Sequence, residues 1–344
     1  MKVAIFAEPG KMIVKEVPKP VIDGEDQAII RIVRASVCGS DLWWYRGIGQ
    51  REHGSLTGHE AIGVVEEVSP DVNGIQAGDF VIVPFTHGCG HCVACCNGFE
   101  GNCLNQKPGT NGGYQAEYLK YEPANSGLVK IPGQPTDYTD EQLASLQALS
   151  DVMATGYHAA VNAEVKPGST VAVIGDGAVG LCGVIGAKLL GAEKIILLSH
   201  HEDRAQLGRE FGATDVVASK GDQAVADVLA LTPDQAGADA VMECVGASGA
   251  IEQAGKIARP GAVIGRVGVP HAEPSSNQFF WKNIGLRGGI ASVTKPDKEV
   301  LLPAVLEGKI NPGKVFTQAF TLDEIQAAYE AMDKRTAIKS LLVF

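Results

Sequence analysis

A histidine and a glutamate stand side by side in the segment Thr57–Gly63, and two further metal-ligating residue types lie far from them. Cys38 lies 21 residues before His59, and Asp151 lies far downstream. A thiolate, an imidazole and a carboxylate suit Zn²⁺, and three protein ligands leave a fourth position for a substrate. A lone His59-Glu60 pair is more often a surface pair or a core histidine, so the remaining segments of the chain have to decide between these interpretations.

Four cysteines in a stretch of fifteen residues form a second group with metal-binding chemistry. They follow the spacing C-x₂-C-x₂-C-x₇-C as Cys89, Cys92, Cys95 and Cys103, with glycines around them that permit tight turns. Two-residue spacers let successive sulfurs converge on one tetrahedral ion, and four filled positions predict a closed, structural zinc site. Cys96 is then spare. Disulfides fit poorly here, because the loops are short and the chain is expected in a reducing compartment.

A glycine-rich turn follows the apolar run Val171–Ile174 and precedes a helical pattern. It reads G-x-G-x-x-G as Gly175, Gly177 and Gly180. Gly175 makes the turn, Gly177 lets the backbone approach a pyrophosphate, and Gly180 lets helix and sheet pack closely. The phosphates then lie at the helix N-terminus. The alternative is a glycine-rich turn with no ligand, but the strand before it and the helix after it favour a dinucleotide site.

The end of the next strand bears on the choice of coenzyme. NAD sites place an acidic residue there to bind the ribose hydroxyls. In this chain the strand Lys194–Leu198 runs into Ser199 and His200, and Arg204 follows one turn later. A hydroxyl, an imidazole and a guanidinium suit a 2′-phosphate, although Glu202 and Asp203 oppose one. The sequence therefore favours NADP over NAD.

The composition is that of a compact two-domain protein. The chain has 344 residues, of which 45% are hydrophobic and 20% charged, and its 42 glycines suit a turn-rich α/β chain. Its length exceeds what one core usually covers. The net charge of −11 argues against a nucleic-acid or anionic-membrane partner. No apolar stretch has the length of a signal peptide or a membrane span, so we expect a cytoplasmic protein with its eight cysteines reduced.

Two kinds of secondary-structure pattern divide the chain. Residues 1–37, Ala61–Val68 and Asp79–Val83 alternate apolar and polar residues, as antiparallel strands do. From about Asp140 the pattern becomes helical, and strands and helices then alternate, which predicts a doubly wound parallel sheet. The expected strands are Val171–Ile174, Lys194–Leu198, Asp215–Val217, Ala240–Cys244 and Ala262–Val267, and the expected helices between them are Val179–Leu190, Asp203–Phe211, Ala224–Leu231 and Ile251–Ile257. The chain closes with a helix near Leu322–Met332 and a strand at Ile338–Phe344.

These motifs, taken together and in this order, resemble the zinc-dependent alcohol dehydrogenases of the medium-chain dehydrogenase/reductase family. The resemblance covers almost the whole chain: C-G-S-D at 38–41, G-H-E at 58–60, the cysteine group, S-D at 150–151 and the glycines at 175–180. It implies an α/β protein with a GroES-like, β-rich catalytic domain at 1–152 and 290–344, which carries a structural zinc lobe at 88–104. A Rossmann doubly wound parallel-sheet coenzyme domain would occupy 153–289.

The resemblance also implies roles for individual residues. Cys38, His59 and Asp151 would be the catalytic zinc ligands, Glu60 a neighbour that can exchange onto the metal, and Ser40 the hydroxyl that bonds the substrate oxygen. The substrate pocket would be lined by Trp43, Phe85 and Met153. The coenzyme would be bound by Thr155, Gly175, Gly177, Ala178, Val179, Gly180, Ser199, His200, Arg204, Val245, Gly268, Val269 and Lys339.

The expected activity is reversible hydride transfer between NADP(H) or NAD(H) and an alcohol, most simply a secondary alcohol/ketone pair or an aldehyde. The same fold also serves polyol, sugar and amino-alcohol dehydrogenases. A non-catalytic NADP-binding protein or a zinc-free reductase is disfavoured, because the chain keeps all the catalytic ligands. Two zinc ions per chain and a homotetramer, or else a homodimer, are the further expectations.

One position departs from the family pattern. Many relatives carry a histidine five residues after the zinc cysteine, where it passes protons to solvent, whereas this chain has Trp43. Proton transfer beyond Ser40 would then need His53, or the cofactor ribose and water. Trp43 and Trp44 would either line the pocket or serve ordinary packing. His87 and His91, beside the cysteines, are expected to be solvated.

Overall fold

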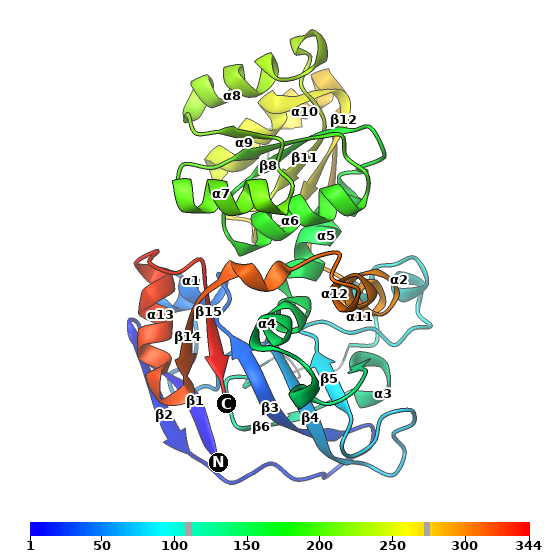
Figure 1. Cartoon of the computed structure of the whole chain (residues 1–344), viewed down its shortest axis with the longest axis vertical. Coiled ribbons are helices and arrows are strands. Elements are labelled where there is room, and N and C mark those ends of the chain that lie inside the picture. Colours follow the sequence, from blue (N-terminus) through cyan, green and yellow to red (C-terminus); the bar gives the residue numbers. More distant parts are fainter. Residues whose placement is uncertain (107–111, 272–275) are drawn as a thin grey trace. The chain divides into compact units, whose positions relative to one another are not determined.

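The computed structural model describes residues 1–106, 112–271 and 276–344 of the chain. Its contacts divide it into two units (Figure 1). Unit 1 consists of Met1–Asp151 and Ser292–Phe344, and unit 2 is the continuous segment Val152–Ala291. The resemblance implied domains at 1–152 with 290–344 and at 153–289, whereas the change in the sequence pattern falls at about Asp140.

Unit 1 is built on antiparallel strands. Its larger sheet has the order β14-β15-β3-β4-β5-β7, with β6 also paired to β3, and a smaller sheet joins β1 to β2. Within the larger sheet the neighbours β14 and β15 run parallel to each other. The strands are β1 Lys2–Glu8, β2 Lys11–Glu16, β3 Ala28–Ser36, β4 Ala61–Val68, β5 Phe80–Val83, β6 Tyr118–Tyr121, β7 Val129–Ile131, β14 Phe316–Thr321 and β15 Lys339–Val343.

Strand β3 is the central element of this unit. It pairs with β4, β6 and β15, and eight of its nine residues are buried. Ile30 and Ile32 on this strand enter a core that also receives Val65 from β4 and Tyr329 from helix α13. Both faces of this strand are covered, so Arg31 is the one exposed residue of β3, and the alternation expected for residues 1–37 does not appear in its burial.

The helices of unit 1 are short, apart from two that pack on the large sheet. Helix α4 begins with a capping box, in which the Thr139 side chain accepts from the Gln142 backbone and the Gln142 side chain accepts in return. The α-helices are α1 Asp41–Tyr45, α2 Val93–Cys96, α3 Ala124–Gly127, α4 Asp140–Leu149, α11 Thr294–Pro296, α12 Leu302–Leu306 and α13 Ile325–Asp333. A π-helical segment, Asp297–Leu301, joins α11 to α12.

Unit 2 confirms the expected doubly wound sheet. Six parallel strands follow the order β10-β9-β8-β11-β12-β13. The strands are β8 Thr170–Ile174, β9 Lys194–Leu198, β10 Asp215–Val217, β11 Ala238–Glu243, β12 Ala258–Arg266 and β13 Gly285–Gly288. The helices are α5 Val152–Asn162, α6 Ala178–Leu189, α7 Glu202–Phe211, α8 Gly221–Ala230, α9 Ser248–Ile257 and α10 Ser276–Lys282.

The sequence patterns did not predict the last elements of this sheet. Strand β13, with the sequence Gly-Leu-Arg-Gly, has no buried residue and no alternation, yet it pairs with β12 at the edge of the sheet. Edge strands need few apolar residues, so periodicity gives little signal for them. None of the helices in the described part of the chain is long and apolar enough to cross a membrane.

Candidate metal and coenzyme sites

Four side chains from three distant segments meet in unit 1. Cys38 lies between β3 and α1, His59 and Glu60 lie directly before β4, and Asp151 follows α4. One ligand atom from each of the four lies within 4.8 Å of the others. Asp151 Oδ2 is 3.5 Å from Cys38 Sγ and 3.4 Å from His59 Nε2. The structure thus brings together the three residues expected as zinc ligands and the glutamate expected beside them.

A fifth residue, Asp41, supports this cluster from behind. Its Oδ2 accepts a hydrogen bond from the Cys38 backbone at 3.1 Å, and its Oδ1 lies 3.7 Å from His59 Nδ1. A carboxylate behind the far nitrogen of a ligating histidine fixes the ring and its tautomer. Sequence analysis gave Asp41 no role, although it is the last residue of the C-G-S-D motif.

Glu60 is held by a buried polar network. Its carboxylate receives the Lys339 ammonium at 2.8 Å and a hydrogen bond from the Ser36 hydroxyl. Lys339 also donates to the Val37 carbonyl, and Gln147 Nε2 donates to Ser36 Oγ at 2.9 Å. Lys339 and Glu60 are each 1% exposed. The lysine expected to bind the coenzyme pyrophosphate is therefore the counter-ion of Glu60 in this structure.

Burial and neighbouring charges shift the protonation of the cluster. Burial raises the pKa of the Cys38 thiol, and the carboxylates of Asp151 and Glu60 raise it further. Burial raises the pKa of Glu60, against which the Lys339 charge acts. For His59, burial lowers the pKa, but Asp41 and Cys38 raise it more, so it ends well above its ordinary value. Each of these groups must give up its proton before it can bind a cation, so metal binding at this cluster would be coupled to proton release.

The donors of this cluster fit a zinc ion. A thiolate, an imidazole and a carboxylate are its ordinary ligands in an open site, and a second carboxylate is within reach. Phe85 adds an aromatic wall, because its ring centroid lies 5.9 Å from that of His59. Ser40, the expected substrate-bonding hydroxyl, stands at the N-cap of α1, two residues from Cys38.

The four cysteines of the lobe also come together. Cys92 Sγ lies 3.4 Å from Cys95 Sγ and 3.9 Å from Cys103 Sγ, and Cys89 Sγ lies 4.0 Å from Cys95 Sγ. Cys96 is exposed and outside the group, as its spacing predicts. The four thiols suit one tetrahedral zinc ion.

Several N–H groups point at these sulfurs. Backbone N–H groups of Cys92 and Cys89 donate to Cys89 Sγ and Cys103 Sγ, and Asn105 Nδ2 lies 3.2 Å from Cys89 Sγ. The backbone N–H of His91 is the largest influence on Cys89, whose pKa falls to about 6. Burial instead raises the pKa of Cys95 to about 12. The loop therefore favours the Cys89 thiolate by itself, whereas the Cys95 thiolate needs a cation.

His87, next to this lobe, differs from its expectation. It is 3% exposed, packs its ring 6.0 Å from that of Tyr121, and finds no hydrogen-bonding partner for either ring nitrogen within the described residues. Burial lowers its pKa. The prediction of a solvated histidine is therefore wrong for His87, because the segment after β5 turns inward, whereas His91 is exposed.

In unit 2 the glycine turn has the geometry that a dinucleotide requires. Gly175 has φ +110°, and a Cβ on Gly180 would lie 1.9 Å from the Gly175 carbonyl oxygen, so only glycine fits there. Around Gly177, the N-cap of α6, the same test finds open space. Ala178 and Val179 form the first turn of α6. The helix N-terminus is thus open to a phosphate.

The residues expected at the adenosine end of the coenzyme gather at the end of β9, together with one that sequence analysis did not consider. Asp176, between the first two glycines, accepts from Ser199 Oγ at 2.8 Å and lies 3.4 Å from Arg204 Nη1. The His200 ring bonds the Ala218 carbonyl at 2.8 Å. An acidic side chain therefore lies among the three residues that favoured a phosphate.

Two loops expected to bind the coenzyme are joined at the ends of β11 and β12. Buried Glu243 accepts from the backbone of Val245 and Gly246, at 2.7 and 2.6 Å, and pairs with Arg266 at 3.2 Å. A Cβ on Gly268 would lie 2.1 Å from Gly246 N. The exposed side chains of Val245 and Val269 are presented by these loops. Glu243 and Arg266 had no role in the sequence analysis.

The remaining expected residues are placed as follows. Met153 and Thr155 lie in the first turns of α5 and are buried in unit 2. Trp43, in α1, is partly exposed, whereas Trp44 is buried and packs its ring 4.8 Å from that of Phe6.

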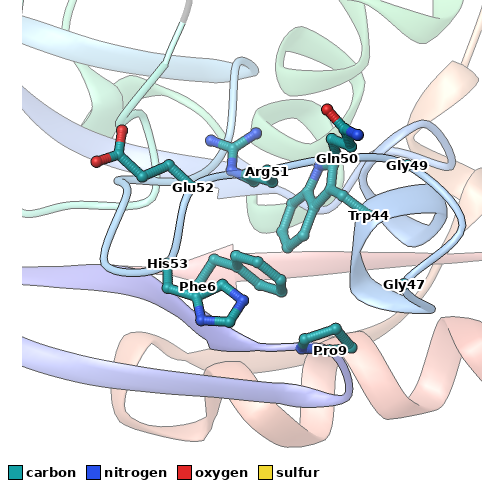
Figure 2. Close-up of a pocket in the computed structure, with 9 residues that line it drawn as sticks. All are labelled: Phe6, Pro9, Trp44, Gly47, Gly49, Gln50, Arg51, Glu52 and His53. Atoms are coloured by element: carbon teal, nitrogen blue, oxygen red, sulfur yellow. The ribbon is translucent and has the colours of Figure 1, made fainter.

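A cavity of about 530 Å³ lies beside α1 in unit 1 (Figure 2). Phe6, Trp44 and His53 provide its aromatic side chains, and Arg51 stacks over Trp44 at 4.6 Å. No residue of the metal cluster lines it. We therefore do not assign it as the substrate site, and the metal cluster remains the centre of the chemistry.

Comparisons with known proteins identify the family of this chain. Residues 24–133 match the alcohol dehydrogenase GroES-like domain, and residues 178–300 match the zinc-binding dehydrogenase domain. The probable zinc-binding alcohol dehydrogenase Rv1895 of Mycobacterium tuberculosis is 32% identical over 343 residues, which cover 98% of this chain and 86% of the relative. This chain belongs to the zinc-dependent alcohol dehydrogenases. The prediction of an oxidoreductase with GroES-like and Rossmann features is thereby confirmed.

Solved structures agree with this assignment of the dehydrogenase. Alcohol dehydrogenase TADH from Thermus sp. ATN1 has a TM-score of 0.89 and 31% identity, with 100% of this chain and 99% of that chain covered. A glutathione-independent formaldehyde dehydrogenase of Pseudomonas aeruginosa is 36% identical over 211 residues, 56% of this chain and 52% of that protein. Membership of this family implies zinc, a nicotinamide cofactor and a small-molecule substrate for the dehydrogenase.

Proposed function

We propose that Cys38, His59 and Asp151 hold the catalytic zinc of this dehydrogenase, and that it interconverts a secondary alcohol with its ketone, or a primary alcohol with its aldehyde. The observation that carries the proposal is the convergence of four ligand atoms within 4.8 Å from three separate segments. Zinc at these ligands supplies a Lewis acid that lowers the pKa of a substrate hydroxyl, and the nicotinamide supplies the hydride acceptor.

The side chains around the ligands would orient the site and move a proton. Asp41 keeps the His59 ring in the orientation that presents Nε2 toward Asp151 and Cys38. Ser40 accepts the proton of the substrate hydroxyl at its Oγ and passes its own proton on. Since Trp43 cannot relay that proton, the acceptor beyond Ser40 is the cofactor ribose and water, or His53.

Glu60 would serve as the residue that can approach the metal. Its carboxylate is one of the four convergent groups, and Lys339 holds it at 2.8 Å. The lysine would therefore act as a positioning residue for Glu60, because its ammonium contacts both Glu60 oxygens and the Val37 carbonyl.

The coenzyme would be bound by the glycine turn and by the loops that present Val245 and Val269. Sequence alone favours NADP(H) because of Ser199, His200 and Arg204. The carboxylate of Asp176 among these residues weakens that preference.

The substrate class is open to a direct test. The formaldehyde dehydrogenase relative adds a small aldehyde to the candidates, and polyols, sugars and amino alcohols are the alternative classes. Initial rates measured through the NAD(P)H absorbance, with both coenzymes and with metal content on the same sample, would identify the class. Turnover with none of these substrates by a fully metal-loaded protein would contradict the proposal and support a non-catalytic nucleotide-binding role.

Two zinc ions per chain, one at each ligand set, form part of the proposal, and the compartment would be the cytoplasm, since all eight cysteines are free thiols. We further propose a homotetramer or homodimer. The exposed rings of Phe280 and Trp281, on α10, support an interface between copies, because large exposed aromatic pairs are rare on monomers. Light scattering of the wild type and of Trp281→Lys would test this proposal.

A further inference from the structure

The carboxylate of Asp176 lies at the end of β9, although Asp176 itself belongs to the glycine turn after β8. Asp176 follows Gly175 at the end of β8, yet its Oδ2 accepts from Ser199 Oγ at 2.8 Å and from the His200 backbone N–H at 3.3 Å. Its Oδ1 lies 3.4 Å from Arg204 Nη1. One acidic side chain thus engages the three residues whose types favour a phosphate.

These contacts leave few donors for a 2′-phosphate. The Ser199 side chain gives its proton to Asp176, and the residue is 1% exposed. The Arg204 charge is paired with Asp176, with side chains that are 12% and 16% exposed. The His200 imidazole is turned to the Ala218 carbonyl. A phosphate would have to replace Asp176 in each of the first two contacts.

A carboxylate in this place suits an unphosphorylated ribose. Rossmann sites that bind NAD place an acidic residue at the end of the second strand, where it accepts hydrogen bonds from the ribose hydroxyls. Ser199 stands at that position here, and the Asp176 carboxylate lies one hydrogen bond away from it. Asp176 therefore brings the missing acidic group to the same place from the neighbouring loop.

We propose that Asp176 determines coenzyme choice in this dehydrogenase, and that it selects NAD(H) by accepting a ribose hydroxyl and repelling a 2′-phosphate. The inference rests on the coenzyme site of the proposed function. A phosphate monoester carries a charge of roughly −1.5 to −2 near neutral pH. It would face Asp176, with Glu202 and Asp203 in the first turn of α7, while the nearest cation, Arg204, is already paired.

The test measures binding with the full-length, metal-loaded protein. Calorimetric titration with NAD⁺ and NADP⁺, and with the fragments 5′-AMP and 2′,5′-ADP, reports on this subsite without turnover. We expect the wild type to bind NAD⁺ and AMP at least about tenfold more tightly than their 2′-phosphorylated counterparts. Asp176→Asn should remove most of this preference. Its affinity for NADP⁺ should rise about tenfold or more, and its affinity for NAD⁺ should fall a few fold.

Two further variants make the result specific. Arg204→Gln added to Asp176→Asn should cancel the gain for 2′,5′-ADP, because the released guanidinium is what holds the phosphate. Asp222→Asn, which removes an equally negative but exposed side chain on α8, should leave the binding ratio unchanged. Thermal melting of each variant checks that it is folded.

The outcomes separate this inference from the proposed function. A wild type that binds 2′,5′-ADP more tightly than AMP would overturn it, as would an unchanged ratio in a folded Asp176→Asn variant. If nucleotides bind as expected but no alcohol or carbonyl compound is turned over, the inference stands and the proposed function fails. If turnover is found but Asp176→Asn leaves the ratio of the two coenzyme affinities unchanged, the proposed function stands and this inference fails.

Discussion

The two sets of metal-ligating side chains in unit 1 are assembled in opposite ways. Cys89, Cys92, Cys95 and Cys103 come from one local segment, and their sulfurs receive N–H groups from that same segment. The cluster around His59 comes from three segments that the large sheet and helix α4 bring together. It is supported by groups far away in the sequence, such as Lys339, which is 279 residues from its partner Glu60.

This difference separates two uses of a metal. In the lobe the four sulfurs come from one short segment, so an ion bound there would itself hold the segment together. Around His59 burial and polar pairing already hold the ligand side chains in place. An ion bound there is not needed to organise the fold, so it can keep an open coordination position. Removing a ligand should therefore lower activity at the cluster around His59 and lower local stability in the four-cysteine lobe.

The largest effect is expected from Cys38→Ala. Loss of one catalytic ligand should lower kcat/KM by about 10⁴-fold, or roughly 5.5 kcal/mol of transition-state stabilisation, while nucleotide binding and the melting temperature stay nearly unchanged. The metal content should fall by one ion per chain. Cys182→Ala, which changes a buried thiol within unit 2, is the matched control and should keep the wild-type kcat/KM and metal content. Full activity in Cys38→Ala would contradict the ligand assignment.

Cys92→Ser should act on stability instead. The lobe would lose its ion, at a cost on the order of 5 kcal/mol to the local fold, because structural zinc binding is itself folding free energy. Limited proteolysis and hydrogen exchange should show opening of residues 88–104, and the metal content should again fall by one. If the lobe stays protected without the ion, the contrast between the two regions does not hold.

Lys339→Met tests whether the fold pre-assembles the catalytic cluster. It leaves the Glu60 carboxylate buried without its counter-ion, which should lower the free energy of unfolding by about 3–5 kcal/mol. Burial already raises the pKa of Glu60, and loss of the lysine raises it further. In the unfolded variant Glu60 ionises above about pH 4.5, whereas in the folded variant its carboxyl keeps its proton. The loss of unfolding free energy relative to the wild type should therefore grow as the pH rises above that value.

The double variant Lys339→Met with Glu60→Gln supplies the control for that measurement. It removes both charges, so urea denaturation should recover most of the lost stability. A single variant as stable as the wild type would mean that the pair contributes nothing to the fold.

The smallest effect is expected from Cys96→Ser. This thiol is exposed, lies next to Cys95 and is outside the group of four. The metal content should stay the same, and stability should change by less than about 0.5 kcal/mol, as at most surface positions. A loss of metal would show that Cys96, rather than Cys95, is the third ligand of the lobe.

The sequence predicted the elements and residues that carry a local signal. The alternation of strands and helices from Val171 to Arg266 was predicted within about three residues at most boundaries, since each element has its own apolar period. The cysteine group was predicted because its spacing is short. The ligand set around His59 required the resemblance to a family, because no local pattern connects Cys38 with Asp151, which lies 113 positions further along the chain.

The polar partners were not predictable in the same way. Asp41, Glu243 and Asp176 each act on a neighbour through one carboxylate, and nothing in their local sequence distinguishes them from solvated acids. The preference for NADP was inferred from residue types at the end of one strand, whereas the group that opposes it reaches there from another loop. His87 was misjudged because polarity alone does not predict burial.

The insertion of unit 2 between the two parts of unit 1 has a consequence for synthesis. Glu60 leaves the ribosome long before its counter-ion, with an entire domain translated between them. Strand β15 pairs with β3 and carries Lys339. The Glu60 carboxylate therefore has no counter-ion until unit 2 and β15 have been synthesised. Unit 2 is a continuous segment and can fold during that interval, so the Glu60–Lys339 pair can form only after the whole of unit 2 has been translated.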